Sequence, residues 1–351
     1  MTTPTITIAG RRIGADAPPY IIAEVSANHN GRIEAALELI TIAKKSGADA
    51  VKLQTYTADT ITIDHDGPDF QIKGGLWDGQ TLYNLYKEAQ TPFEWHPALF
   101  EHGRKLGIDV FSSPFDDSAI ELLESLDAPA FKIASFEAID LPLIRRAARS
   151  GKPLIISTGM TSPDEIQRAL DAAREGGCRD VALLHCVSEY PAAPDTCNLR
   201  TIPDLSQRYG VVAGLSDHTM GTAVSVAAVA LGAALIEKHF TDSRAKGGPD
   251  SAFSLEPPEL TELCNSTRIA HQALGAPHYK RSKGEEANRQ FRRSLYVVQD
   301  IPAGAAFTRE NVRSIRPGYG LPPDRIADVL GRRAARDLAR GTALTDDALA
   351  E

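Results

Sequence analysis

Mostly apolar runs of six to nine residues recur along the first 240 positions and alternate with segments of helical periodicity. Each run is apolar along most of its length, as in a parallel strand that is buried on both faces. We predict that these runs are eight strands: Tyr20–Ser26, Ala50–Tyr56, Asp109–Phe115, Ala130–Ser135, Pro153–Gly159, Val181–Val187, Val211–Thr219 and Leu235–Thr241.

The segments between these runs carry apolar residues at helical spacing. Among them we predict four clear helices: Ile33–Ser46, Asp117–Leu126, Asp140–Ser150 and Ser162–Glu175. The last begins with a capping serine and a proline at the first helical position. Glycines stand where the helices should end, at Gly47, Gly107, Gly151 and Gly177.

Eight strand–helix alternations in about 260 residues predict a (β/α)8 TIM barrel. The alternative is a doubly wound open sheet. No GxGxxG sequence follows the first predicted strand, so the dinucleotide-binding form of that alternative lacks its motif.

The pattern changes after Gly275, where charged and polar residues take over. We predict a barrel domain over residues 1–276, a linker over 277–290 and a small β-rich domain over 291–351. Its expected strands are Ser294–Val298, Val312–Ile315 and Ala334–Leu338. About 60 residues make a marginal core, so this domain should dock on another surface.

The composition is that of an ordinary globular protein, with 42% hydrophobic and 24% charged residues. A net charge of −8 gives no reason to expect nucleic acid or an anionic membrane as a partner. The apolar stretch Ala223–Ile236 is too short to span a bilayer. The four cysteines form no CxxC pair and the start lacks a signal-peptide pattern, which predicts reduced thiols in the cytoplasm.

Polar side chains gather at the predicted strand ends, where a TIM barrel holds its chemistry. They comprise two lysines, two carboxylates, two histidines and several hydroxyls: Lys52, Lys132, Glu24, Glu137, His218, His239, Ser113, Ser135, Ser157, Ser188 and Ser216. Singly, a serine there is usually a helix cap, a histidine a structural hydrogen-bonding group and a lysine part of an ion network. Together they would be costly to bury without a ligand.

These residue types suit an anionic substrate. Two lysines with several hydroxyls fit a compact dianion such as a phosphate ester or phosphoenolpyruvate. His218 and His239, on adjacent strands, can share one divalent metal with water completing the shell. Such an open site suits a Lewis acid better than a structural zinc. The residues alone therefore predict metal-assisted carbon–carbon chemistry or hydrolysis on a phosphate-bearing substrate.

Several of these motifs, in this order, resemble the sialic acid (nonulosonic acid) synthase family over essentially the whole chain. The matching segments are Ala23-Glu24, Asn28-His29-Asn30-Gly31, Lys52-Leu53-Gln54-Thr55, Ser113-Pro114-Phe115, Lys132-Ile133-Ala134-Ser135, Ile156-Ser157-Thr158-Gly159-Met160, Gly214-Leu215-Ser216-Asp217-His218-Thr219, Glu237-Lys238-His239-Phe240-Thr241 and Gly248-Pro249-Asp250. In the tail, Arg316-Pro317-Gly318-Tyr319-Gly320 resembles the antifreeze-like (SAF, β-clip) domain of these enzymes.

Within the family, several stretches are similar to the pseudaminic acid branch. Sialic acid synthases usually read Gly-x-Asn-His where this chain has Ser26-Ala27-Asn28-His29. The aromatic segment with Trp77, Tyr83 and Tyr86 also agrees with that branch, although a helix face packed on the barrel would explain it equally well. Three departures from sialic acid synthases concern the sugar rather than the reaction: Ser188 replaces an asparagine, an asparagine is missing around Gly74–Gly75, and an aromatic is replaced near Gln290.

The resemblance implies a barrel that binds phosphoenolpyruvate and an open-chain acetamido sugar. The positions that match phosphoenolpyruvate contacts are Lys52, Ser113, Lys132, Ser135, Ser157, Ser188 and Ser216. His218 and His239 match ligands of Mn²⁺ or Mg²⁺. The positions around the sugar are Gln54, Glu137, Tyr190 and Asp250, together with Arg316, which would reach in from the partner's small domain in a domain-swapped homodimer.

For the pseudaminic branch, the implied reaction joins phosphoenolpyruvate, 2,4-diacetamido-2,4,6-trideoxy-L-altrose and water. It gives pseudaminic acid for a bacterial surface glycan, and releases phosphate by C–O cleavage. Glu24 is the first candidate to position and deprotonate the water, and Glu137 the second.

Three alternatives remain. The sugar can instead be N-acetylmannosamine or the legionaminic precursor, against which the aromatic segment argues. A 3-deoxy sugar-acid synthase of another type would take a phosphorylated sugar, against which the SAF-like tail argues. A non-catalytic SAF-domain binding or scaffold protein would be expected to have lost one of the lysines, histidines or Glu24, and all are present.

Overall fold

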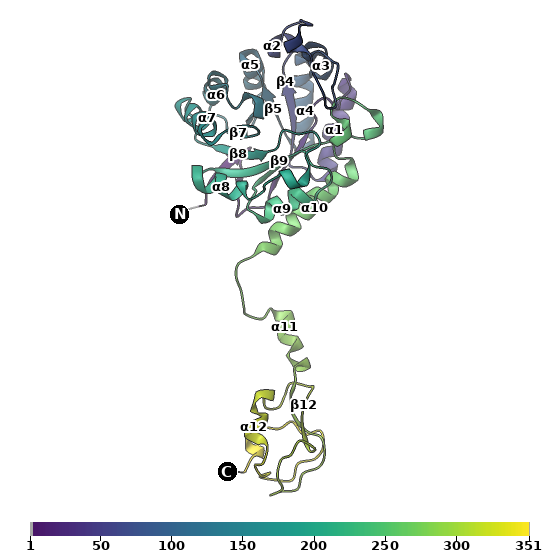
Figure 1. The fold of residues 1–351 in the computed structure, drawn as a ribbon, viewed down its shortest axis with the longest axis vertical. Coiled ribbons are helices and arrows are strands. Elements are labelled where there is room, and N and C mark those ends of the chain that lie inside the picture. Colours follow the sequence, from purple (N-terminus) through teal and green to yellow (C-terminus); the bar gives the residue numbers. More distant parts are fainter. Residues whose placement is uncertain (1–2, 351) are drawn as a thin grey trace. The chain divides into compact units, whose positions relative to one another are not determined.

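The computed structural model describes residues 3–350 and divides the chain into two units, one through Gly275 and one from Ala276 onward. The first unit is a closed barrel of eight parallel strands surrounded by helices (Figure 1). All eight predicted runs form its strands: β3 (Tyr20–Glu24), β4 (Ala50–Thr55), β5 (Asp109–Pro114), β6 (Phe131–Ile133), β7 (Leu154–Ser157), β8 (Val181–Cys186), β9 (Val212–Asp217) and β10 (Leu235–His239).

The strands follow one another around the barrel in chain order, and β10 pairs in parallel with β3 to close it. This closure confirms the TIM barrel and excludes the open doubly wound sheet, which would leave two strand edges unpaired.

Helices cover the outside of the barrel, and the four predicted ones begin and end within two residues of their expected bounds. The helices are α1 (Ile33–Ser46), α2 (Ala58–Ile61), α3 (Leu82–Ala89), α4 (His96–Leu106), α5 (Asp117–Ser125), α6 (Leu141–Ala148), α7 (Pro163–Glu175), α8 (Thr201–Tyr209), α9 (Ala223–Ala230) and α10 (Pro257–Leu274). Ser162 caps α7 in a capping box with Glu165, and Gly47 ends α1 at φ 93°, a left-handed conformation that glycine adopts without strain.

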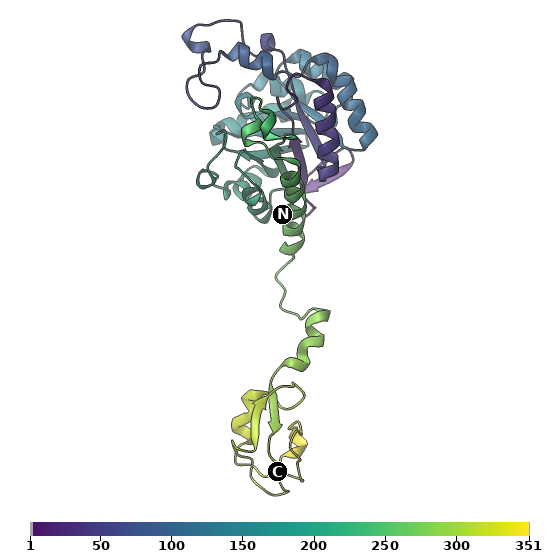
Figure 2. The same cartoon turned by 90° about the vertical axis from the view of Figure 1, so that its right-hand side faces the viewer.

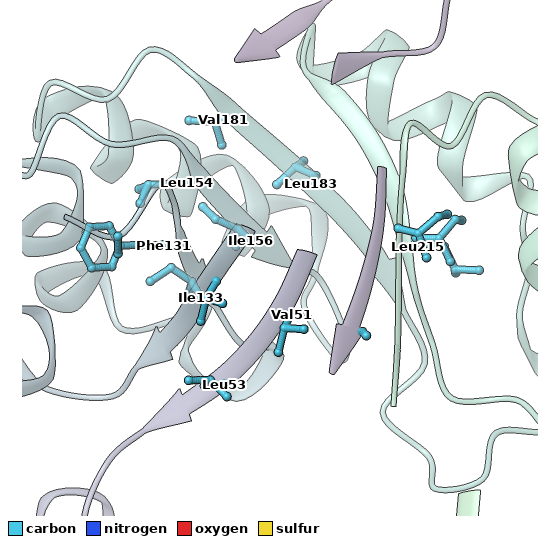
Figure 3. Packing of buried hydrophobic residues seen from close by; sticks show 14 of the residues in the cluster. Val51, Leu53, Phe131, Ile133, Leu154, Ile156, Val181, Leu183 and Leu215 are labelled. Carbon is cyan, nitrogen blue, oxygen red and sulfur yellow. The ribbon is translucent and has the colours of Figure 1, made fainter. Parts of the chain in front are cut away.

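The strands are apolar on both faces because each face meets a hydrophobic layer. Figure 3 shows side chains such as Val51, Phe131 and Leu183, which pack in the cluster between strands and helices. The alternate residues of the same strands, such as Ile22 and Leu184, belong to a second cluster inside the barrel. This double burial explains why the runs lack strict alternation.

The N-terminal end of the barrel is closed by a hairpin that the sequence did not predict. Its strands β1 (Thr5–Ile8) and β2 (Arg11–Gly14) pair antiparallel. Ile6, Ile8 and Ile13 are buried in the apolar cluster inside the barrel, with residues at the starts of the barrel strands. The opposite, C-terminal end is where polar side chains enter the barrel.

The second unit has a hydrophobic core of its own, which includes Leu295, Phe307 and Leu344. Its strands β11 (Ser294–Val297) and β12 (Val312–Ile315) pair antiparallel. The prediction of a third strand over Ala334–Leu338 was wrong, because that segment pairs only through isolated bridges. The unit also contains the short helix α12 (Ile326–Val329).

The segment expected as a linker begins as irregular chain and then forms α11 (Lys283–Ala287), which Ser282 caps. In the first unit, the connection between β4 and α3 extends outward as a long loop (Figure 2). Among residues 3–350, no helix is long and apolar enough to cross a membrane.

Candidate active site

The side chains that point into the barrel change from apolar to polar along each strand. Strand β10 illustrates the change, because Leu235 lies in the inner apolar cluster and Glu237 and His239 follow at two-residue spacing. The polar inward positions of the eight strands are Glu24, Lys52, Gln54, Ser113, Lys132, Ser157, Cys186, Ser216, Glu237 and His239. They gather at the C-terminal end, where a TIM barrel holds its catalytic groups.

Four of these residues form a buried ion cluster, which we call the inner cluster: Glu24, Lys52, Lys132 and Glu237. Lys52 Nζ lies 2.8 Å from a Glu24 oxygen and 3.7 Å from Glu237 Oε1. Lys132 Nζ lies 3.1 Å from the same Glu237 oxygen. All four side chains are at most 6% exposed, so two like-charged ammonium groups are held together by carboxylates away from water.

The charges of the inner cluster shift one another's pKa values. Burial alone would raise the pKa of Glu237, but Lys132 and Lys52 outweigh burial and lower it. Burial lowers the pKa of Lys132, and burial of Lys52 is outweighed by Glu237 and Glu24, which raise its pKa. Glu237 is therefore the permanent anion that keeps both lysines in place.

Glu24 and Glu137 are carboxyl groups poised near neutrality. Burial raises the pKa of Glu24 to about 7, with Lys52 opposing and Glu237 adding to the shift. Burial likewise raises the pKa of Glu137 to about 7. A carboxyl group with such a pKa can accept a proton or give one up at neutral pH.

Hydroxyl groups surround the lysines on the neighbouring strand ends. Lys52 Nζ donates to Ser113 Oγ at 3.3 Å, and Ser216 Oγ donates to Glu237 at 3.2 Å. The Ser157 hydroxyl is buried and has no hydrogen-bond partner among the described residues. Ser157 ends β7, which pairs with the Lys132 strand β6, and a buried hydroxyl without a partner among the described residues is the kind of group that a bound anion would satisfy.

Backbone and side-chain donors also converge at Gly159, after β7 (Leu154–Ser157). Its N–H donates to Ser135 Oγ at 3.2 Å. A Cβ at this position would lie 2.2 Å from Ser188 Oγ and 2.7 Å from Ser135 Oγ, so only glycine fits. The predicted residues Ser135 and Ser188 are thus brought together over one glycine.

His218 and His239 lie side by side, with ring centroids 5.4 Å apart. His218 Nδ1 donates to the Val187 carbonyl at 2.8 Å, which leaves Nε2 with a free lone pair. His239 Nδ1 is buried and has no hydrogen-bond partner among the described residues. These atoms fit a two-imidazole metal site whose other ligands are water or substrate, and no group of three ligating side chains occurs in residues 3–350.

The charge state of the two histidines differs. Burial, followed by the neighbouring His218, holds the pKa of His239 well below its usual range, which keeps this ring neutral as a metal ligand must be. Burial also disfavours charge on His218, but the nearby Cys186 sulfur outweighs burial and raises its pKa.

A polar corner lies between β3, β4 (Ala50–Thr55) and the loop after β10. The Gln54 amide donates to Glu24 Oε1 and to Ser26 Oγ, both at 3.0 Å. The Ser26 hydroxyl donates in turn to the Asp250 carboxylate. The predicted sugar-contacting residues Gln54 and Asp250 are therefore joined in one hydrogen-bond chain.

An aromatic wall lies over the histidines. The Tyr190 ring lies 4.3 Å from that of His218 and 5.8 Å from that of Trp77, measured between centroids. Trp77 Nε1 donates to the Pro249 carbonyl at 3.0 Å, beside Asp250. Of the three aromatics in this segment, Trp77 contacts a predicted site residue, whereas Tyr83 bonds Asp59 and Tyr86 packs on Tyr56.

The comparisons with known proteins agree with this geometry. The NeuB family profile matches residues 39–279, and the SAF domain profile matches residues 292–350. The chain belongs to the NeuB family. It is 45% identical over 331 residues to a pseudaminic acid synthase of Campylobacter jejuni, covering 94% of this chain and 96% of that one. It is 44% identical to one of Helicobacter pylori, covering 94% and 97%.

Among solved structures, the N-acetylneuraminic acid synthetase of Leptospira borgpetersenii matches with a TM-score of 0.73 and 32% identity. It covers 82% of this chain and 95% of that one. The family and the branch that the motifs predicted are confirmed by these relatives, as is the SAF domain of the tail.

The NeuB barrel carries every predicted site residue of the first unit on its strands or in the loops that follow them, but Arg316 belongs to the second unit, where it is exposed. Sequence reasoning missed Glu237 and Ser26 as site residues. Glu237 stood in a motif that drew attention only to His239, and its inward direction follows from the two-residue spacing between them. No sequence signal marked the link from Ser26 to Asp250, which lies 224 residues away.

Proposed function

We propose that this NeuB-family chain is a phosphoenolpyruvate-dependent synthase. It condenses phosphoenolpyruvate with 2,4-diacetamido-2,4,6-trideoxy-L-altrose and water to give pseudaminic acid and phosphate. The observation that carries the proposal is the buried cluster of two lysines and two glutamates beside paired histidines, in a chain 45% identical to a pseudaminic acid synthase.

Phosphoenolpyruvate binds at the inner cluster in this proposal. Lys52 and Lys132 balance its phosphate and carboxylate charges, and these contacts strengthen in a site that excludes water. The hydroxyls of Ser113, Ser157 and Ser216 offer hydrogen bonds to the same anion, and Ser135 and Ser188 flank Gly159. Glu237 holds both ammonium groups in place before the anion arrives.

The carbon–carbon bond forms when C3 of phosphoenolpyruvate attacks the sugar aldehyde, which leaves positive character at C2. Water then adds at C2, and the tetrahedral product loses phosphate by cleavage of the C–O bond, which leaves a ketone at C2. Of the two protons of the water, one ends on the former aldehyde oxygen and the other leaves with the phosphate. Glu24 accepts the proton of that water, because its carboxyl group has a pKa of about 7 and lies beside Lys52. Glu137 has a similar pKa and is the second candidate.

His218 and His239 would hold a divalent cation, Mn²⁺ or Mg²⁺, with water or substrate completing its coordination. When bound, the cation supplies a Lewis acid at the aldehyde oxygen. Two observations support this donor pair: the free lone pair of His218 Nε2, and His239 Nδ1, which has no hydrogen-bond partner in residues 3–350.

The sugar lies against Gln54, Glu137, Tyr190 and Asp250 in this proposal. The protein acts in the cytoplasm as a homodimer, in which Arg316 from the partner's second unit completes the sugar site. Arg316 is exposed within its own unit, so its guanidinium is available to another surface.

A subunit-complementation assay tests the swapped arrangement. The Lys132→Met variant has a defective barrel site and an intact Arg316. The Arg316→Ala variant has an intact barrel site and lacks the arginine. Mixed dimers of the two should regain phosphate release, because an intact barrel then meets an intact arginine from its partner. Mixtures that stay inactive, despite exchange of subunits shown by tagged copies, would place Arg316 in its own chain's site, and an active Arg316→Ala variant would place it outside the reaction.

The proposed reaction is tested by phosphate release from phosphoenolpyruvate with Mn²⁺ or Mg²⁺ present. The altrose derivative and N-acetylmannosamine are supplied in parallel reactions. Release with the altrose derivative alone supports the proposal. Release with N-acetylmannosamine alone would keep the reaction and overturn the sugar, and release with neither would overturn both.

A further inference from the structure

Ser26 follows the last residues of β3 in a backbone conformation that serine seldom adopts. Its φ is 45°, in the left-handed region that favours glycine, and the residue is only 4% exposed. Non-glycine residues in this region carry backbone strain, and such strain tends to persist at functional sites. The turn itself, closed by the Asn28 N–H to the Val25 carbonyl at 3.0 Å, would form with less strain on a glycine.

The Ser26 hydroxyl gives the reason for a side chain at this position. Gln54 Nε2 donates one N–H group to Glu24 Oε1 and the other to Ser26 Oγ, so both of its N–H groups are used. The hydroxyl accepts from Gln54 and has one proton left, which it donates to Asp250. Each donor group in this hydrogen-bond chain therefore has its acceptor fixed by the groups on either side of it.

The same hydrogen-bond chain determines which hydrogen-bonding groups the polar corner leaves free for a ligand. With both Gln54 N–H groups occupied, its remaining group is the carbonyl oxygen, an acceptor. When ionised, Asp250 likewise presents only acceptor oxygens, and its side chain is 13% exposed. The corner is therefore built to recognise donors, that is, hydroxyl or acetamido N–H groups, rather than carbonyl oxygens.

We propose that Ser26 is a positioning residue that fixes Gln54 and Asp250 as paired acceptors for the sugar's hydroxyl and amide donors. The inference rests on the proposed function, because it takes the acetamido sugar as the ligand of this corner. It adds that the backbone strain at Ser26 is tolerated because the hydroxyl group is needed. Substitutions that remove the hydroxyl, with or without the strain, can therefore separate the two effects.

The test compares Ser26→Ala, which keeps the strained Cβ and loses the hydroxyl, with Ser26→Gly, which loses both. Both variants should raise the KM for the altrose derivative about tenfold or more, because a hydrogen bond to a charged group is lost. The KM for phosphoenolpyruvate should stay close to the wild-type value in both. Ser26→Gly should melt at a higher temperature than Ser26→Ala, because glycine relieves the backbone strain.

Two controls separate positioning from a general effect on the fold. Ala9→Gly relieves a left-handed residue (φ 47°) in the exposed β1–β2 turn, and should raise the melting temperature with unchanged kinetics. Because Ser26 acts through Gln54 and Asp250, Ser26→Gly should raise the sugar KM by a smaller factor in an Asp250→Ala background than in the wild-type protein.

The outcomes separate this inference from the proposed function. Wild-type protein that releases no phosphate with either sugar would overturn the proposed function, and the inference with it. Active wild-type protein whose Ser26→Ala and Ser26→Gly variants keep the wild-type sugar KM, or raise both KM values equally, would overturn the inference alone.

Discussion

Two buried lysine–carboxylate groups lie on opposite faces of the same barrel strand, β10. Lys238 pairs with Asp217 at 2.9 Å on the helix side, and we call this the outer pair. Glu237, the adjacent residue, faces the interior and belongs to the inner cluster with Lys52 and Lys132. The exposure of the outer pair is 1% for each side chain, so both groups are equally removed from water.

The two groups differ in how completely their polar atoms are paired. Asp217 accepts from Thr219 N, Thr219 Oγ1 and Ser225 Oγ as well as from Lys238, so both of its oxygens are fully used. In the inner cluster Glu237 Oε2 has no hydrogen-bond partner among the described residues, and Ser157 Oγ nearby has none. A closed set of hydrogen bonds indicates a structural role, and an open set indicates a place for a ligand.

The largest expected effect comes from the paired histidines at the mouth of the inner cluster. Replacing His218 or His239 with Ala should lower metal-dependent turnover by about 10⁴-fold, because the cation loses one of two protein ligands. Phosphate release over a titration of Mn²⁺ measures this.

The matched control is His185, a strand-end histidine whose Nε2 is already bonded to the Cys197 carbonyl at 2.6 Å. His185→Gln should keep near-wild-type turnover. Near-normal activity in either of the other two histidine variants would refute the assignment of metal ligands.

Glu24 should set the acid side of the pH profile. Burial raises its pKa to about 7, and a proton acceptor must be ionised. Turnover should therefore be fully present above pH 8 and be lost as the pH falls through 7. Glu24→Gln should lower kcat about a thousandfold and abolish this limb.

Glu137→Gln is the comparison variant, since Glu137 has a pKa of about 7 as well. It should keep the acid limb even if its activity falls. An acid limb that disappears with Glu137→Gln and survives in Glu24→Gln would exchange the two roles.

Substituting Lys132 in the inner cluster and Lys238 in the outer pair should separate an effect on phosphoenolpyruvate binding from an effect on the free energy of unfolding. Lys132→Met should lower kcat/KM for phosphoenolpyruvate about a hundredfold and leave the fold intact, because Glu237 keeps Lys52 and Ser216 as partners. Lys238→Met leaves Asp217 buried without its cation, and should destabilise the protein by about 3–5 kcal/mol. Urea unfolding and steady-state kinetics on both variants measure the contrast. Equal losses of stability would remove the distinction between the two groups.

The smallest effect should come from the aromatic wall. Trp77→Ala loses the contact with Tyr190 and the hydrogen bond to Pro249, and should raise the sugar KM about fivefold. Tyr83→Ala should leave it unchanged, since Tyr83 bonds Asp59 instead. A larger effect from Tyr83 would show that the wall acts through the fold of its loop.

The strands of the barrel could be predicted because double burial makes them continuous apolar runs. The β1–β2 hairpin could not, since Arg11 and Arg12 interrupt a strand of four residues. The prediction of a third strand in the tail was wrong because its residues form single bridges to separate partners.

The site was predictable as a set of residue types at strand ends, but not as a network. Glu237 and Lys238 are neighbours in sequence, and residue type alone does not show which of them belongs to the site. Their side chains point to opposite faces of the strand, and only Glu237 faces the barrel interior. The closed outer pair and the open inner cluster become distinct only when their partners are known. The individual roles of the site residues remain predictions.

Phosphoenolpyruvate should bind at the open inner cluster, and calorimetric titration of phosphoenolpyruvate tests this most directly. Wild-type protein and Lys132→Met are compared after circular dichroism has shown that both are folded. We predict saturable binding to wild-type protein and its loss in Lys132→Met. Equal affinity in the two proteins would contradict the claim, because the anion would then bind elsewhere.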